Sequence, residues 1–105
     1  MDAMRQTRLR QLLQLTEEIV QSAREKDWDA MIEKEQQRRS LLREFFQHSI
    51  ALNEVSHIEE TIRQVMALDR KIISLAEAGK LEILKKMRNL SAGRHAIDAY
   101  VDNSG

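Results

Sequence analysis

The chain has 105 residues, no cysteine, no proline and only three glycines. This length suits one domain, and apolar residues that are mostly Leu, Ile, Met and Ala favour helices. Sheet folds need frequent Gly, Pro and Asn turns, so a β-sandwich and a nucleotide-binding α/β fold are excluded. Seventeen basic residues balance seventeen acidic ones, which argues against a nucleic-acid-binding surface.

The absence of cysteine and of a long apolar segment further narrows the possible classes of protein. The lack of cysteine excludes a disulfide framework and a thiolate metal site. No leader pattern and no long apolar run occurs, so we expect neither a membrane span nor a membrane partner, and we expect a cytoplasmic protein.

The N-terminal half predicts a helical hairpin. Residues 2–26 place apolar side chains at three- and four-residue spacings, with Thr16 on the same face, which is typical of an amphipathic helix. Asp27 is a suitable N-cap for a second helix. The inward positions of that second helix are expected to be Trp28, Met31, Ile32, Leu42, Phe45 and Phe46. Because Phe45 and Phe46 are adjacent, they cannot both face one core, and one of them is a candidate contact residue.

The middle of the second helix is polar where its periodicity calls for apolar residues. Glu35 and either Arg38 or Arg39 occupy such positions. One interpretation is an exposed helix middle with a Glu35–Arg39 pair. The other is a buried polar group that fixes the packing register.

A turn is expected between Gln47 and Ser56, followed by one long helix to about Ala92. Its main apolar stripe is predicted to face the hairpin. Met66, Ile73 and Leu84 form a second stripe, with Leu81 further round, that the hairpin cannot also cover, so some apolar surface should stay exposed. Gly79 lies within the main stripe and indicates either a close helix approach or a bend.

Gly93 is a residue type that favours the end of a helix. After it, the chain carries Ala96, Ile97, Tyr100 and Val101 at amphipathic spacing. A helix this short must dock to be stable. The predicted fold is therefore all-α, with an antiparallel hairpin packed on a long third helix and a short C-terminal helix or tail. We expect residues 1–92 to form a three-helix antiparallel bundle and residues 93–105 to form the amphipathic tail.

The sequence contains few motifs that could support catalysis or the binding of a metal or cofactor. Glu54 and His57 match one Glu-x-x-His element, but a dinuclear carboxylate site needs two such elements. His48 and His95 are solitary, and phosphate loops and nucleophile elbows are missing. We therefore expect no catalytic, cofactor-binding or metal site, and no enzyme. A metal-dependent enzyme is the least favoured class.

Two stretches resemble a known family. Trp28 to Glu35 reads WDAMIEKE, similar to the Trp-Asp-x-Leu-Ile-x-x-Glu pattern at the start of the second helix in FliT-type flagellar export chaperones. The second stretch runs through Lys71, Leu75, Glu82 and Lys85 to a terminal Ala99–Tyr100. Members of this bacterial family are small helical proteins that hold the filament-cap (hook-associated) protein in the cytoplasm before type III export.

The resemblance implies a chaperone that covers the C-terminal segment of the filament-cap protein. Components of the export ATPase complex and the flagellar master transcription regulator are further candidate partners. We expect Trp28 to be a structural anchor and Ile97, Tyr100 and Val101 to act as a tail or lid. The expected client-binding groove is lined by Ile72, Leu75, Gly79, Ile83 and Met87. The alternative is a homo-oligomeric helical adaptor or coiled-coil regulatory protein without an export client, in which the surplus stripe forms a homodimer interface.

Overall fold

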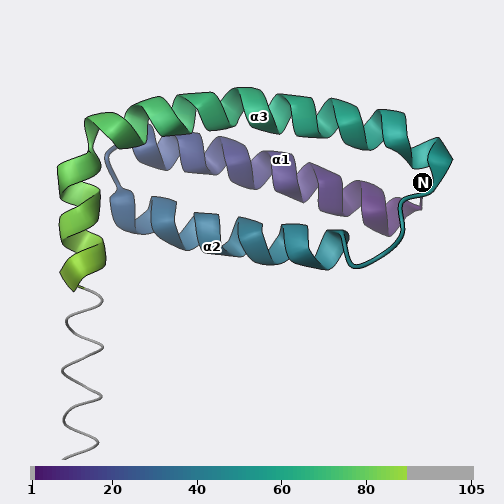
Figure 1. Ribbon diagram of the computed structural model, residues 1–105, viewed down its shortest axis with the longest axis horizontal. Helices are drawn as coiled ribbons and strands as arrows, with labels where there is room; N and C mark the ends of the chain where they lie inside the picture. Colours follow the sequence, from purple (N-terminus) through teal and green to yellow (C-terminus); the bar gives the residue numbers. More distant parts are fainter. Residues whose placement is uncertain (1, 90–105) are drawn as a thin grey trace, which may run out of the picture.

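The N-terminal half forms the predicted helical hairpin (Figure 1). The structure is a computed structural model that describes residues 2–89. Helix α1 spans Ala3–Arg24 and helix α2 spans Trp28–Phe45. The turn between them uses Lys26 at φ 57°, and the Asp27 carboxylate accepts a hydrogen bond from the backbone N–H of Ala30 at 3.2 Å. Asp27 is therefore confirmed as the N-cap of the second helix.

The third helix starts after a connection that is tied to the beginning of α1. Helix α3 spans Val55–Ala78 and follows a single 3₁₀ turn, η1, at Leu52–Glu54. The Glu54 carboxylate accepts hydrogen bonds from the backbone N–H of Ala51 at 2.9 Å and from Arg5 Nε at 2.7 Å. These two bonds, the backbone one first, hold the pKa of Glu54 below its ordinary value. The second turn thus lies inside the predicted stretch.

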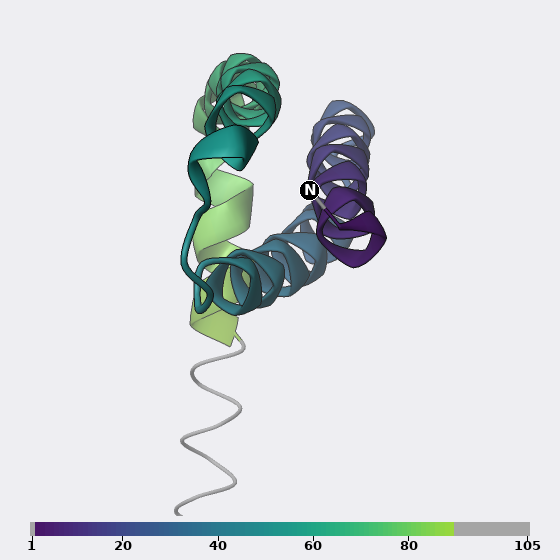
Figure 2. The ribbon, with the colours of Figure 1, turned by 90° about the vertical axis from the view of Figure 1, so that its right-hand side faces the viewer.

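The core is built in successive layers along the three helices. Helix α1 packs against both α2 and α3, whereas the backbones of α2 and α3 do not approach each other closely. Figure 2 shows the three helices end-on. The core positions of α1 alternate at three- and four-residue spacing, as in a coiled coil. The buried layers are Leu9 with Phe45 and Ile58, then Leu12 with Leu41 and Val65, then Ile19 and Ala23 with Trp28 and Met31.

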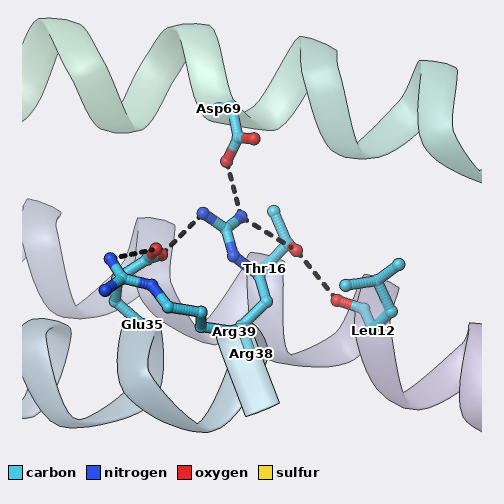
Figure 3. A network of polar contacts seen from close by, with 6 residues as sticks. All are labelled: Leu12, Thr16, Glu35, Arg38, Arg39 and Asp69. Carbon is cyan, nitrogen blue, oxygen red and sulfur yellow. Dashed lines mark hydrogen bonds and ion pairs between the residues drawn. The ribbon is translucent and has the colours of Figure 1, made fainter. Parts of the chain in front are cut away.

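A polar layer interrupts these apolar layers at the middle of the bundle (Figure 3). The Arg38 side chain, 11% exposed, donates to Asp69 of α3 at 2.6 Å, to Glu35 at 2.6 Å and to Thr16 Oγ1 at 3.3 Å. Thr16 is fully buried and donates in turn to the carbonyl oxygen of Leu12. One guanidinium therefore joins all three helices. The polar middle of α2 is a half-buried packing feature, while the Glu35–Arg39 pair at 3.7 Å is a looser addition at its edge.

The expected single helix to about Ala92 is interrupted at Gly79. Helix α3 ends at Ala78, and a second helical segment runs over residues 80–89, which we call the arm. Figure 1 shows the arm turning away from the α3 axis and passing the start of α2. The backbone bonds Gly79 N to Leu75 O and Ile83 N to Gly79 O persist, so the change of direction is local. Leu90, Ala92 and Gly93 lie outside the described residues.

Across residues 2–89, no helix combines the length and the apolar character that crossing a bilayer requires.

Candidate functional site

Trp28 holds the arm against the hairpin. Its ring is 2% exposed and packs on Gly79, where a Cβ atom would lie 2.7 Å from Cη2 and 2.8 Å from Cε2 of the ring, and closer still to Cζ2. Its indole Nε1 donates a hydrogen bond to the Glu82 carboxylate at 2.8 Å. Because no side chain fits between the ring and the backbone at position 79, glycine permits the close approach there.

A second polar contact and one apolar contact complete the attachment of the arm. Lys86 Nζ lies 2.8 Å from the Asp29 carboxylate, and this hydrogen bond raises the pKa of Lys86 above its ordinary value. Ile83 packs on the cluster formed by Ile19, Ala23, Trp28 and Met31. The arm is therefore fastened through one face, which carries Glu82, Ile83 and Lys86, to the first two residues of α2.

The structure brings together most of the predicted groove residues. Ile72, Leu75 and Ile83 are half-buried against the same core cluster, and Gly79 lies beneath the Trp28 ring. Met87 is 51% exposed and is not part of that cluster. Ile97, Tyr100 and Val101, the predicted lid, lie outside the described residues.

Leu75 also lines a surface hollow beside α3. This hollow, about 360 Å³, is bordered by Arg24, Arg70, Lys71 and Ser74. It combines an apolar floor with basic side chains, a lining that suits a peptide with apolar and acidic groups better than it suits a small apolar ligand.

Beyond the first residue of α3, the large apolar side chains that remain exposed along α3 and the arm are those of the predicted second stripe, with Leu81, and Met87 of the predicted groove. These side chains are between 45% and 83% exposed, which leaves room for contact with another chain. The members of this set, which we call the outer apolar row, are Met66, Ile73, Leu81, Leu84 and Met87.

A second group of exposed apolar side chains surrounds the connection between α2 and α3, at the opposite end of the hairpin from the arm. Phe45 is buried while its neighbour Phe46 is 46% exposed, which resolves the expectation that the two cannot share one core. Sequence periodicity did not identify the rest of this group, because three of its members lie in or next to a turn without a helical repeat and Met4 lies in the first turn of α1. They are Met4, Ile50, Leu52 and Val55.

The polar residues considered for metal binding serve other purposes. Glu54 is buried and bonded to Arg5, whereas His57 is exposed, so the pair does not converge. Within residues 2–89, no group of three or more His, Asp or Glu side chains is placed to hold a metal ion.

Comparison with known families gives a match to the family described as flagellar protein FliT, over residues 6–103. Comparisons with curated proteins and with solved structures gave no match. The matched range includes the hairpin, α3, the arm and most of the predicted tail. Membership in this family implies a non-enzymatic chaperone role in flagellar export. This chain matches the family over nearly its whole length, and its described residues form helices with an exposed apolar row. It belongs to the FliT flagellar protein family.

Proposed function

We propose that the chain is the cytoplasmic export chaperone of the flagellar filament-cap protein and that it covers the C-terminal segment of this client before export. The observation that carries the proposal is the outer apolar row on α3 and the arm, in a chain of the FliT family. An export substrate held unfolded exposes apolar side chains, and an amphipathic segment can bury them against such a row.

The client segment lies along α3 and reaches the arm in this proposal. Ile72, Leu75, Gly79, Ile83 and Met87 line its groove, and the half-buried members of this set form the floor while Met87 forms the rim. Ile97, Tyr100 and Val101 border or occupy the groove when no client is bound. A lid of this kind lowers the apparent affinity by the fraction of molecules that are open.

The test is calorimetric titration with the C-terminal segment of the filament-cap protein from the same genome. The full chain and a version ending at Gly93 are titrated in parallel, and a full-length Ile97→Ser/Tyr100→Ser variant controls for effects of truncation. Saturable one-to-one binding that the tail changes is the expected result. The proposal would be refuted if none of the three proteins gave a binding signal at about 100 μM, a concentration at which even a complex of micromolar affinity is saturated.

Two outcomes would favour other functions. A stable oligomer in light scattering, with the outer apolar row buried between copies, supports the adaptor alternative. Competition between the client segment and the flagellar transcription regulator would extend the proposal to gene control through the same surface. A matched substitution, Met87→Ser against Leu52→Ser at the far end of the molecule, separates loss of the groove rim from a general loss of surface apolarity.

A further inference from the structure

The face of the arm that points away from the hairpin carries a distinct chemistry. Because Glu82, Ile83 and Lys86 fasten the arm to α2 and its core, the helical repeat directs residues 81, 84 and 88 to the opposite side. Leu81 is 83% exposed and Leu84 is 45% exposed. Two leucines one helical turn apart thus face solvent on a helix whose other face is already occupied.

Basic side chains surround these two leucines. Lys80, Lys85 and Arg88 are all exposed and lie beside or between them on the helix surface. Residues 80–89 hold four basic side chains against one carboxylate, although the whole chain is neutral.

Charges within the arm are divided between its two faces. Glu82 is bonded to Trp28, and Lys86 is paired with Asp29, so both belong to the fastened face. Lys80, Lys85 and Arg88 have no ion-pair partner among residues 2–89. The outer face therefore presents three cations and two leucines with no acidic group among them.

We propose that this outer face, made of Lys80, Leu81, Leu84, Lys85 and Arg88, binds an acidic amphipathic helix of a partner protein. Such a helix would place its apolar side chains between Leu81 and Leu84 and its carboxylates against the flanking cations. A helix that binds a membrane surface needs a broad apolar face. Two leucines flanked by cations are too narrow for that, and they match the side of another helix.

This binding face shares its two leucines with the outer apolar row, but it includes none of the residues that line the proposed client groove. The groove residues Ile72, Leu75, Gly79 and Ile83 lie on the fastened side of α3 and the arm, and none of them belongs to the outer face. An acidic partner would therefore leave the groove free but compete for the two leucines with a client that also covers the outer apolar row, and the inference does not require the filament-cap protein to be that client.

The test uses the full chain and a designed peptide of about 15 residues, long enough to hold a helix when bound. The peptide has leucines at three- and four-residue spacing flanked by glutamates, and a second peptide replaces every glutamate by lysine. Fluorescence anisotropy of the labelled peptide should show saturable binding that weakens as salt is raised. Lys80→Glu/Lys85→Glu should weaken this binding about tenfold, since it turns two attractive pairs repulsive. The matched control, Arg10→Glu/Arg43→Glu, changes the same net charge on exposed positions of α1 and α2 and should have less than about a twofold effect.

An apolar pair of variants completes the design. Leu81→Ser should weaken peptide binding by about tenfold through loss of buried area, whereas Leu52→Ser, equally exposed at the other end of the molecule, should not. Circular dichroism and Trp28 emission verify that each variant is folded.

Several results would overturn the proposal. Equal binding of the lysine peptide, equal loss in the control variants, or no binding by the full chain would each do so. Binding to phosphatidylglycerol vesicles that exceeds peptide binding and depends on Lys80 and Lys85 would assign the face to a membrane surface instead. Self-association that Lys80→Glu/Lys85→Glu abolishes would assign it to a second copy of the chain.

Discussion

Replacing Gly79 by alanine tests the contact that positions the arm. The added Cβ would lie within 2.8 Å of two ring atoms of Trp28, and closer to a third. An ordinary contact between two carbon atoms is about 3.5–4.0 Å, so the ring would have to move away until it regains that distance. Trp28 is buried among Ile19, Ala23 and Met31, so it cannot move without disturbing that cluster. The substitution therefore adds volume where the packing has no space.

The expected cost follows from two opposing effects. Overpacking a core site costs about 1–3 kcal/mol. Alanine is favoured over glycine in a helix by at most about 1 kcal/mol, and less at position 79 because this residue ends α3. The free energy of unfolding should consequently fall by about 1–2 kcal/mol, which lowers the Tm by roughly 4–8 °C for each kcal/mol in a domain of this size.

The assay combines urea unfolding with the emission of Trp28, the only tryptophan in the chain. Ring displacement should expose the indole and shift its emission to longer wavelength. A double-mutant cycle with Trp28→Phe, followed by circular dichroism, should give a coupling of about 1 kcal/mol, since the smaller ring leaves room for the methyl group. If Gly79→Ala raises the stability and leaves the emission unchanged, Gly79 is only an unfavourable helix residue and the reasoning about the bend is wrong.

Three further predictions concern the polar contacts. Glu82→Ala should lower the stability by about 1–3 kcal/mol and shift the Trp28 emission, because the buried indole N–H loses its acceptor; Glu82→Gln should retain most of both properties. Arg38→Ala should lower the free energy of unfolding, measured in urea, by about 2 kcal/mol. This loss is smaller than that from breaking a fully buried ion pair, because Asp69 is one-third exposed. The double variant Arg38→Met with Asp69→Leu should recover most of the lost stability. The hydrogen bonds to Glu54, the backbone one first, lower its pKa. Their stabilisation of the fold is therefore present above the ordinary carboxyl pKa and is lost as the pH falls through the lowered pKa of Glu54. The difference between the urea midpoints at neutral and at acid pH should consequently be smaller in Glu54→Gln than in the unchanged chain.

The hairpin was predictable because its signals are local. A residue with a short acceptor side chain, Asp27, precedes an apolar repeat, and the core positions of α1 recur at regular spacing. The polar middle of α2 could be read only as a pair of alternatives, since the deciding residue, Asp69, comes from α3 and shares no sequence pattern with Arg38. Its burial depends on packing between elements distant in the chain.

The bend at Gly79 was harder to predict for the same reason. The apolar repeat continues through this position, and no proline marks a break, so periodicity alone favours one uninterrupted helix. The Trp28 ring, which packs on the backbone at the bend, belongs to the start of another helix. Ile72, Leu75 and Ile83 of the predicted groove share one face, but that face packs partly on the hairpin, and much of the exposed apolar surface lies on the second stripe.

The two stretches that carry the family resemblance meet in space. Trp28 contacts Gly79 and Glu82, and its neighbour Asp29 pairs with Lys86, so the Trp-Asp motif of α2 fastens the part of the second stretch around Glu82. These contacts explain why the motif is needed even when no partner is bound, because the Trp-Asp motif determines the position of the arm. Because the arm carries three of the five residues of the outer apolar row, a change at Trp28 or Asp29 should alter partner binding without removing any contact residue. A binding defect in such a variant would then identify a positioning role, provided that the fold is intact.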